Sequence, residues 1–550
     1  MKYRFQWNFP IFFSPHNPKR LYACSNQLHF TENGGQSWET ISPDLTRNDP
    51  AKLGLFRRSI TKDNTSVEYY CTIFAAAESI HETGVIWTGS DDGLIHLTRD
   101  GGKNWSNVTP KGMPEWMMIN SIDIDPFHPG GVFVAGTRYK LGDYKPYLYH
   151  TTDYGASWKL ITTGIDPAHF TRVVRADAKR KGLLYAGTES GMYISFDNGA
   201  HWQPFQMNLP IVPITDLTIK NDNLIVATQG RSFWVIDDLT VLHQLSEDVA
   251  KKDFHLFNPM DAWRMDGSQG RPSKTEGTNH PGGVTLHYLV NELPADSVAV
   301  KLSIYDANGT LVRTWSSTSK EKKEQLEYKK GGNTFNWDLR YPDGVDFDGM
   351  VLWWAGVGGP KAQPGQYEAR LSVGDAVQSQ TFEIKPDPRS EATTEDMAAQ
   401  FAFMKSVQDK VSEAHQAIID LRAIKQQIKA FTDRLPETGQ ETLRNQAKAI
   451  VEGLTAVEES LYQTKNQSNQ DPLNFPVRLT NKLAHLNALV GIGDHRPTQQ
   501  AYAVKAEIAA MIDDELKAYN RIISEELPKL NQLIRESPID IIASPEKIKP

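Results

Sequence analysis

Alternating hydrophobic and polar residues dominate the first part of the chain, whereas helical spacing dominates its end. Apolar strand pairs occupy residues 85–98, 183–195 and 224–238. From about residue 394 the apolar positions instead repeat at intervals of three and four residues, as at Val407, Val411, Ala414, Ile418 and Leu421. The pattern predicts a multidomain chain that is mainly β first and α afterwards.

One eight-residue pattern recurs four times before residue 210: a hydroxyl residue, Asp or Asn two positions on, Gly two positions later, and a final Trp. An Asp or Asn side chain in a turn can bond backbone amides two or three residues on, and Gly supplies the positive φ that the turn requires. The Trp ring is expected to pack against the neighbouring unit. We therefore assign a structural role to the repeated positions, which are Asn33, Gly35, Trp38, Asp100, Gly102, Trp105, Asp153, Gly155, Trp158, Asp197, Gly199 and Trp202.

Repeats of this length with several short strands each are typical of β-propeller blades. We expect about five blades between residues 10 and 245, in a propeller segment that spans 1–250 and whose closure without a preceding segment is left open. Residues 251–389 read as a β-sandwich of immunoglobulin or fibronectin III type with a linker at 264–283, because strands such as 300–305 alternate. Residues 390–550 are expected to form a helical bundle, with Thr498 capping its last helix.

Charge and composition narrow the classes of partner. The 550 residues carry a formal net charge of −8, which argues against a nucleic-acid partner. We find no apolar run long enough for a membrane span. The only cysteines, Cys24 and Cys71, give no metal-site spacing, so neither a metal nor another cofactor is expected. The N-terminus lacks a secretion signal and reads like the middle of a β protein, which suggests an upstream segment.

The repeats are those of Asp-box propellers, and longer phrases resemble one family more closely. PIFFSPHNPKRLYACSNQLHFTENGGQSWETISPDLT and VIWTGSDDGLIHLTRDGGKNWSNVTP are similar to the large sortilin-type propeller proteins of bacteria, which are often labelled glycosyl hydrolases. The resemblance continues through NTFNWDLR and RPTQQAYAV, and the chain looks like the C-terminal half of that architecture. It implies a binding scaffold for a peptide, protein or glycan in the envelope or outside the cell. An upstream propeller segment or a second copy of the chain is an expected partner.

The loops between the second and third strands of the blades are the candidate ligand face, opposite the Asp-box turns. They contain a mixed-charge set of side chains, namely Asp91, Asp92, Arg138, Asp143, Glu189 and Arg231. The alternative is that these are solvated turn residues without function. A glycoside hydrolase of the Asp-box class is the competing function, although no catalytic residue is identified. Two carboxylates facing each other across a cleft, one with a raised pKa, would favour the hydrolase.

Overall fold

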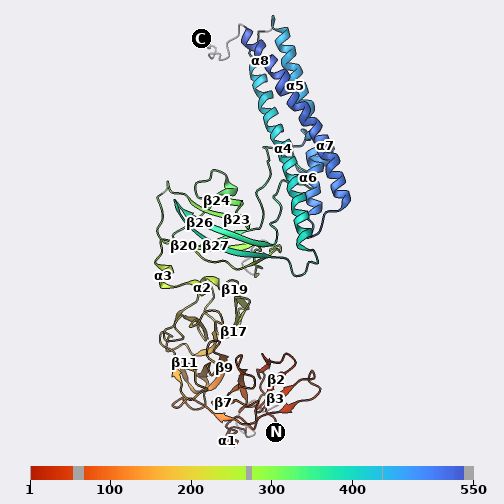
Figure 1. Cartoon of the computed structure of the whole chain (residues 1–550). Helices are drawn as coiled ribbons and strands as arrows, with labels where there is room; N and C mark the ends of the chain where they lie inside the picture. The colour runs from red at the N-terminus through yellow and green to blue at the C-terminus, as the bar shows by residue number, and fades with distance from the viewer. Residues whose placement is uncertain (1, 54–66, 268–275, 296, 437, 538–550) are drawn as a thin grey trace. The chain divides into compact units, whose positions relative to one another are not determined.

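The computed structural model describes residues 2–53, 67–267, 276–295, 297–436 and 438–537, so part of the linker expected at 264–283 lies outside the described residues. The chain divides into two compact units, Met1–Leu245 and Ser246–Pro550. In Figure 1 the first unit carries the red to yellow-green strands, and the second carries the green strands and the blue helices. The expected division at 250 lies close to this boundary. A separate division at 389 stays a prediction.

Small antiparallel sheets, consistent with propeller blades, make up the first unit. Four of them have four strands and one has three, with strands in chain order. The strands are β1 (Ile11–Phe13), β2 (Leu21–Cys24), β3 (Leu28–Thr31), β4 (Glu39–Thr40), β5 (Ile73–Glu78), β6 (Ile86–Ser90), β7 (Ile95–Thr98), β8 (Ser106–Asn107), β9 (Met118–Ile124), β10 (Val132–Arg138), β11 (Asp143–Thr151), β12 (Lys159–Leu160), β13 (Thr171–Ala176), β14 (Leu184–Thr188), β15 (Gly191–Ser195), β16 (Gln203–Pro204), β17 (Ile214–Lys220), β18 (Asn223–Thr228) and β19 (Phe233–Ile236). Short helices join them at α1 (Pro50–Leu53), η1 (Tyr139–Leu141) and α2 (Thr240–Gln244).

Each sheet packs its apolar face on the next sheet along the chain. A separate buried cluster fills each of the four junctions, as with Trp87 of the second sheet and Ile119 of the third. The first strands of the second to fifth sheets, β5, β9, β13 and β17, contact one another in sequence. They form the inner layer of the array. Cys24 and Cys71 are buried free thiols.

Arg175 of β13 ties three of these inner strands together. Its guanidinium donates to the backbone oxygen of Leu217 (2.7 Å), the hydroxyl of Ser121 (2.7 Å) and the carboxylate of Asp216 (2.7 Å). Because β9 and β17 supply these partners and β13 carries Arg175, the side chain links three sheets through polar contacts. It is already engaged, and so it is a poor candidate for gripping a ligand carboxylate.

Two further sheets share one buried cluster in the second unit. The three-stranded sheet has the order β20-β22-β25, and the five-stranded sheet has the order β21-β27-β26-β23-β24, in which only β21 and β27 are parallel. Their strands are β20 (Phe254–Leu256), β21 (Ala262–Trp263), β22 (Val284–Val290), β23 (Val300–Asp306), β24 (Leu311–Ser316), β25 (Gly331–Trp337), β26 (Gly365–Val373) and β27 (Ala376–Lys385). Short helices lie at α3 (Glu247–Ala250) and η2 (Lys322–Glu324).

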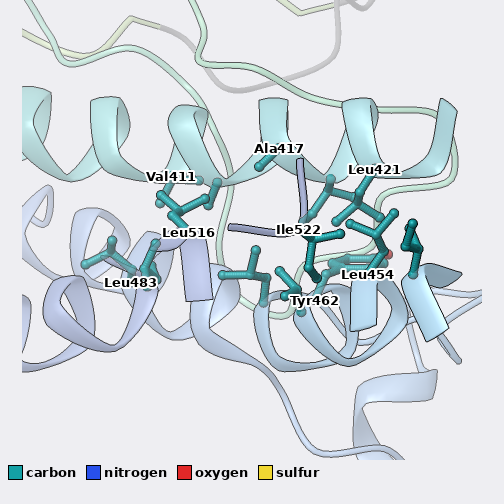
Figure 2. Packing of buried hydrophobic residues seen from close by; sticks show 14 of the residues in the cluster. Val411, Ala417, Leu421, Leu454, Tyr462, Leu483, Leu516 and Ile522 are labelled. Carbon is teal, nitrogen blue, oxygen red and sulfur yellow. The ribbon is translucent and has the colours of Figure 1, made fainter. Parts of the chain in front are cut away.

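The expected C-terminal helical region is confirmed. It contains α4 (Thr394–Thr432), α5 (Glu441–Leu461), η3 (Asp471–Leu473), α6 (Leu479–Val490), α7 (Gln499–Arg521), a π-helical turn η4 (Ile522–Glu526) and α8 (Leu527–Glu536). Thr393 opens α4 in a capping box with Asp396, and Thr498 caps α7 by accepting from the amide of Ala501. Leucine, isoleucine and valine stripes from these helices form one buried cluster. Figure 2 shows Val411, Ala417 and Leu421 of α4 pointing toward side chains of the other helices.

A long connection between β25 and β26 joins the sheets to the helices. Its Phe347 makes edge-to-face contacts with His415 of α4 and Tyr462 after α5. The backbone of Trp353 exchanges two hydrogen bonds with the side chain of Asn481 (2.7 and 3.0 Å). These contacts explain why the sheets and helices belong to one compact unit. Within the described ranges, none of the helices has both the length and the apolar character needed to cross a bilayer.

Candidate functional site

The four Asp-box turns have the same internal hydrogen bonds. In the second box Asp100 accepts from the hydroxyl of Thr98 (2.9 Å) and from the amide of Asn104 (2.9 Å), while the amide of Gly102 donates to Thr98 (2.9 Å). Equivalent bonds recur in the other three boxes. The amide that donates to the Asp or Asn side chain belongs to the residue four positions later in the chain, whereas the sequence predicted two or three positions. The amide and side chain of Asn104 lower the pKa of Asp100 to about 2, so it stays ionised and is unsuited to donating a proton.

The Trp of each later box fastens its sheet to the preceding one. The indole nitrogens of Trp105, Trp158 and Trp202 donate to backbone oxygens of the previous repeat at 2.9, 2.9 and 2.7 Å. Trp202 is 5% exposed, whereas Trp38 of the first box is 44% exposed. The repeated residues therefore serve the packing between sheets.

Grooves between successive Asp-box turns follow from this packing. One of about 710 Å³ lies between the second and third turns, and a similar one of about 650 Å³ lies between the third and fourth. Asp100 and Asp153 both line the first groove. Hydrogen bonds lower the pKa of each, from Asn104 to Asp100 and from Ser157 to Asp153, so neither of these two carboxyl groups is suited to be a general acid.

A different cleft, of about 640 Å³, lies over the inner strands of the first unit. Strands β5, β9, β10, β13 and β17 all contribute side chains, so four sheets meet there. Its aromatic members are Trp7, Tyr70, Phe74, Trp116 and Tyr139. Its cations are Lys52, Arg138, Lys140 and Arg172, and Asp91 is the one carboxylate that lines it among the described residues.

Asp91 and Asp92 are neighbours with different surroundings. Asp91 accepts from the amide and hydroxyl of Thr72 at 2.8 and 3.0 Å, and burial raises its pKa to about 7. Asp92 is fully buried and holds the amide of Arg47 (2.8 Å) and the hydroxyl of Ser90 (2.6 Å). The hydrogen bonds of Asp92 therefore stabilise the loop between β6 and β7, while Asp91 lines the cleft.

Two ion pairs hold the arginine side chains that line the cleft. Arg138 bonds Asp143 (2.8 Å), which also accepts from the hydroxyl of Tyr147 (2.7 Å). Arg172 pairs with Glu189 (2.6 Å). Asp143 and Glu189 thus act through the arginines and do not line the cleft. Lys52 and Lys140 form no ion pair in the described part of the chain, although the charge of Lys140 acts on the carboxyl group of Asp91.

Trp116 is the most distinctive aromatic group of the cleft. It lies just before β9 at a φ of 58°, an uncommon backbone conformation for a bulky residue. Its ring stacks near Tyr70 (6.4 Å between centroids), and the cations of Arg47 and Lys52 lie over it at 4.8 and 5.4 Å. Such a ring, half-buried and held on several sides, presents a rigid surface to a ligand.

Comparison with known proteins adds distant structural similarity alone. No family model matches the chain, and no curated protein does. An ancestral GH74 enzyme matches at 15% identity and a TM-score of 0.32, over 57% of this chain and 38% of the other. The GH74 xyloglucanase from Xanthomonas campestris matches at 13% and 0.33, over 67% and 63%. YCF48 bound to a D1 peptide matches at 17% and 0.27, over 44% and 69%.

These are distantly similar β-propeller proteins, and the chain's match spans 38% of the length of the ancestral GH74 enzyme. At such TM-scores the similarity carries no argument about the site. The cleft is therefore interpreted from its own residues.

Sequence reasoning found part of this cleft. It named Asp91 and Arg138, which line it, and Asp143, which braces Arg138. Arg231 lies elsewhere: it is exposed and donates to the backbone of Gly230. The cleft residues that were not predicted include Lys52 and Trp116, and the aromatic residues at 70, 74 and 116, in or near the inner strands β5 and β9, were the available signal.

Proposed function

We propose that the chain is a sortilin-type Asp-box propeller scaffold that binds a peptide, protein or glycan ligand through the cleft over its inner strands. The observation that carries the proposal is the composition of the cleft: five aromatic residues and four cations against one buried carboxylate. Aromatic surfaces contribute contact area at low entropic cost, and lysines that form no ion pair attract an anionic group. The preferred ligand therefore has a carboxylate or similar anion next to an apolar or ring-shaped group.

The volume of the cleft fits this class of ligand. At about 640 Å³ it lies within the range of roughly 300–1,000 Å³ that is usual for small-molecule sites, so it admits a few residues of a peptide or one or two sugar rings. Lys140 and Lys52 supply charge, and the ring of Trp116 supplies a platform. Each comes from a separate element, so recognition requires the assembled sheets.

A binding screen with matched variants tests the proposal. Acidic peptide and acidic glycan arrays are probed with the wild-type chain, with Trp116→Ala and Lys140→Ala, and with Arg231→Ala as a control outside the cleft. We expect ligands that the wild type and Arg231→Ala retain and that Trp116→Ala loses by more than about tenfold, as for an interface anchor. Retention by folded Trp116→Ala at wild-type strength would contradict the proposal.

A glycoside hydrolase of the Asp-box class is the second candidate, and one observation favours it. The pKa of Asp91, raised to about 7 by burial, is that of a general acid at neutral pH. Hydrolysis also needs a second carboxylate about 5–10 Å away, and no other carboxylate lines the cleft among the described residues. We therefore rank binding above hydrolysis.

We propose further that the sheet array pairs with an upstream propeller segment or a second copy of the chain. Phe12 of β1 and Trp234 of β19 pack inward, so their neighbours point to the opposite faces of the first and fifth sheets. Those neighbours are exposed: Phe13 at 62% and Phe233 at 76%. Apolar sheet faces of this kind favour association. Sedimentation that finds a monodisperse monomer of the 550-residue chain would count against pairing.

Two expectations from the resemblance remain proposals. We propose an envelope or extracellular location, which immunodetection in culture-fluid, envelope and cytosolic fractions would test; a signal in the cytosol alone would refute it. We also propose that residues 251–389 form an immunoglobulin or fibronectin III-like sandwich, supported by a cluster that both sheets share. An experimental structure with the sheets crossing far from about 30° would contradict that.

A further inference from the structure

A second cavity, of about 330 Å³, lies inside the second unit where its sheets meet its helices. Its walls come from four separate parts of the chain: the segment after β21, the connection between β25 and β26, the start of α4, and the end of α6 with the residues that follow it. This volume is at the low end of the roughly 300–1,000 Å³ usual for small-molecule sites. The cavity is distinct from the cleft of the first unit, and nothing in the proposed function uses it.

Three cations converge on this cavity against two carboxylates. Arg264 is 5% exposed and pairs with Asp494, while Lys361 pairs with Asp266 (3.0 Å). The Arg340 guanidinium donates to the backbone oxygen of Gly359 (3.2 Å) and forms no ion pair in the described ranges, although its charge helps to lower the pKa of Asp266. One positive charge is therefore left over at the cavity.

The three cations also influence one another's ionisation. Burial lowers the pKa of Lys361, and the positive charges of Arg264 and Arg340 lower it further although Asp266 opposes them. Burial likewise lowers the pKa of Arg264, with a contribution from Arg340. Groups that repel in this way are stabilised when an anion enters between them.

The backbone of the cavity wall is open to a ligand. Gly356, Gly358 and Gly493 line the cavity, and a Cβ built on any of them would meet no atom within 4 Å. Gly356 and Gly358 do not have a left-handed φ, so neither backbone strain nor crowding within the protein demands glycine there. The free space in front of them is where a small ligand would lie against the main chain.

We propose that this cavity is a binding site for a small oxyanion, a phosphate or carboxylate group, held by Arg340 with Lys361 and Arg264 and resting against Gly356 and Gly358. A planar guanidinium can bond two oxygens of such a group at once. The two carboxylates, Asp266 and Asp494, remain with Lys361 and Arg264 and keep the net charge of the empty site low. The bound anion then links the sheets to the helices.

Calorimetric titration of the 550-residue chain with inorganic phosphate and, separately, with acetate tests this site. We compare the wild type with Arg340→Gln, which removes the free cation, and with Gly358→Val, which fills the cavity without changing charge. The controls are Arg313→Gln on β24 and Gly332→Val on β25, a glycine whose Cβ also meets open space. Circular dichroism verifies that each variant is folded.

We expect saturable binding of at least one anion, weakened about tenfold or more in Arg340→Gln and Gly358→Val and unchanged in both controls, as the loss of a charge-assisted hydrogen bond implies. Binding of phosphate alone or acetate alone supports the site and identifies its chemistry. No saturable binding of either anion to the folded wild type would overturn the proposal. Equal affinity in wild type, Arg340→Gln and Gly358→Val would do so as well. Trp116→Ala, which tests the other cleft, should not alter the titration.

Discussion

Two aspartates of one sheet show how differently the two ends of a blade are used. Asp100, in the turn between β7 and β8, repeats the bonds of its three counterparts, and amide donors hold its pKa at about 2. Asp91, in the loop between β6 and β7, has surroundings of its own, and burial raises its pKa to about 7. The repeated end serves packing between sheets. The varied end supplies the cleft.

Removing an Asp-box Trp should produce the largest effect. Trp202 is nearly buried and bonds the previous repeat, whereas Trp38 is half-exposed and bonds no preceding repeat among the described residues. We expect Trp202→Ala to lower the free energy of unfolding by about 3–5 kcal/mol and Trp38→Ala by under about 1 kcal/mol, since truncation of a buried ring leaves a cavity. Urea denaturation measures both. Equal losses of unfolding free energy in the two variants would contradict the expectation that an internal box contributes more to stability than the first box.

A matched glycine pair isolates packing from backbone strain. Gly155 and Gly35 have similar φ values of 81° and 88°, so alanine strains both alike. A Cβ on Gly155 would lie 2.7 Å from Val108 of the previous repeat, while one on Gly35 meets only Trp38 at 3.8 Å. We expect Gly155→Ala to cost about 1–3 kcal/mol more than Gly35→Ala in chemical denaturation. A difference near zero between the two stability losses would mean that neighbouring sheets shift to accommodate the added methyl group.

The pH dependence of stability should separate Asp91 from Asp100. The folded pKa of Asp91 is raised, so between about pH 4 and 7 the folded chain holds a proton that the unfolded chain has lost. The contribution of Asp91 to the free energy of unfolding is therefore fully present below pH 4 and is lost as the pH rises toward 7. We expect a loss of about 1–2 kcal/mol between pH 5 and 7. Asp91→Asn mimics the protonated side chain and should remove that slope, whereas Asp100→Asn should leave it. Thermal melts between pH 5 and 7 measure the pH dependence of stability for each variant. An unchanged pH dependence in Asp91→Asn would contradict the raised pKa of Asp91.

Arg231→Ala should have the smallest effect. Its side chain is exposed and bonds only the neighbouring Gly230, so we expect a stability change within about 0.5 kcal/mol and unaltered ligand retention. Loss of ligand binding in this variant would extend the site beyond the cleft. The array screen above already includes this variant, and urea denaturation measures its stability.

The repeated residues made the sheets predictable from the sequence. The spacing from Thr98 to Asn104 fixes a local turn, and local hydrogen bonds depend on few other parts of the chain. The helical region was equally predictable from the sequence, because apolar residues at helical spacing, such as Val411 and Leu421, indicate which face of the helix is buried. Thr498 could be named as a cap from its position alone.

The cleft was only half predictable, because it depends on contacts between residues far apart in the chain. Lys52, Trp116 and Arg172 meet only after the inner strands have packed together. Asp91 and Asp92 are indistinguishable in sequence, yet one reaches the cleft and the other is buried beneath it. Arg231 lies in a loop at the expected end of its sheet, but its side chain is not among the described residues that line the cleft.

Turnover of a bound polysaccharide by wild type and Asp91→Asn is the most direct test of the central claim that the cleft binds without cleaving. Glycans retained by the array are incubated with each protein at pH 6–7, and released reducing ends are measured. The account predicts no release by either protein, with Asp91→Asn still binding. Release by the wild type that disappears in Asp91→Asn while binding persists would contradict it and make the chain a hydrolase.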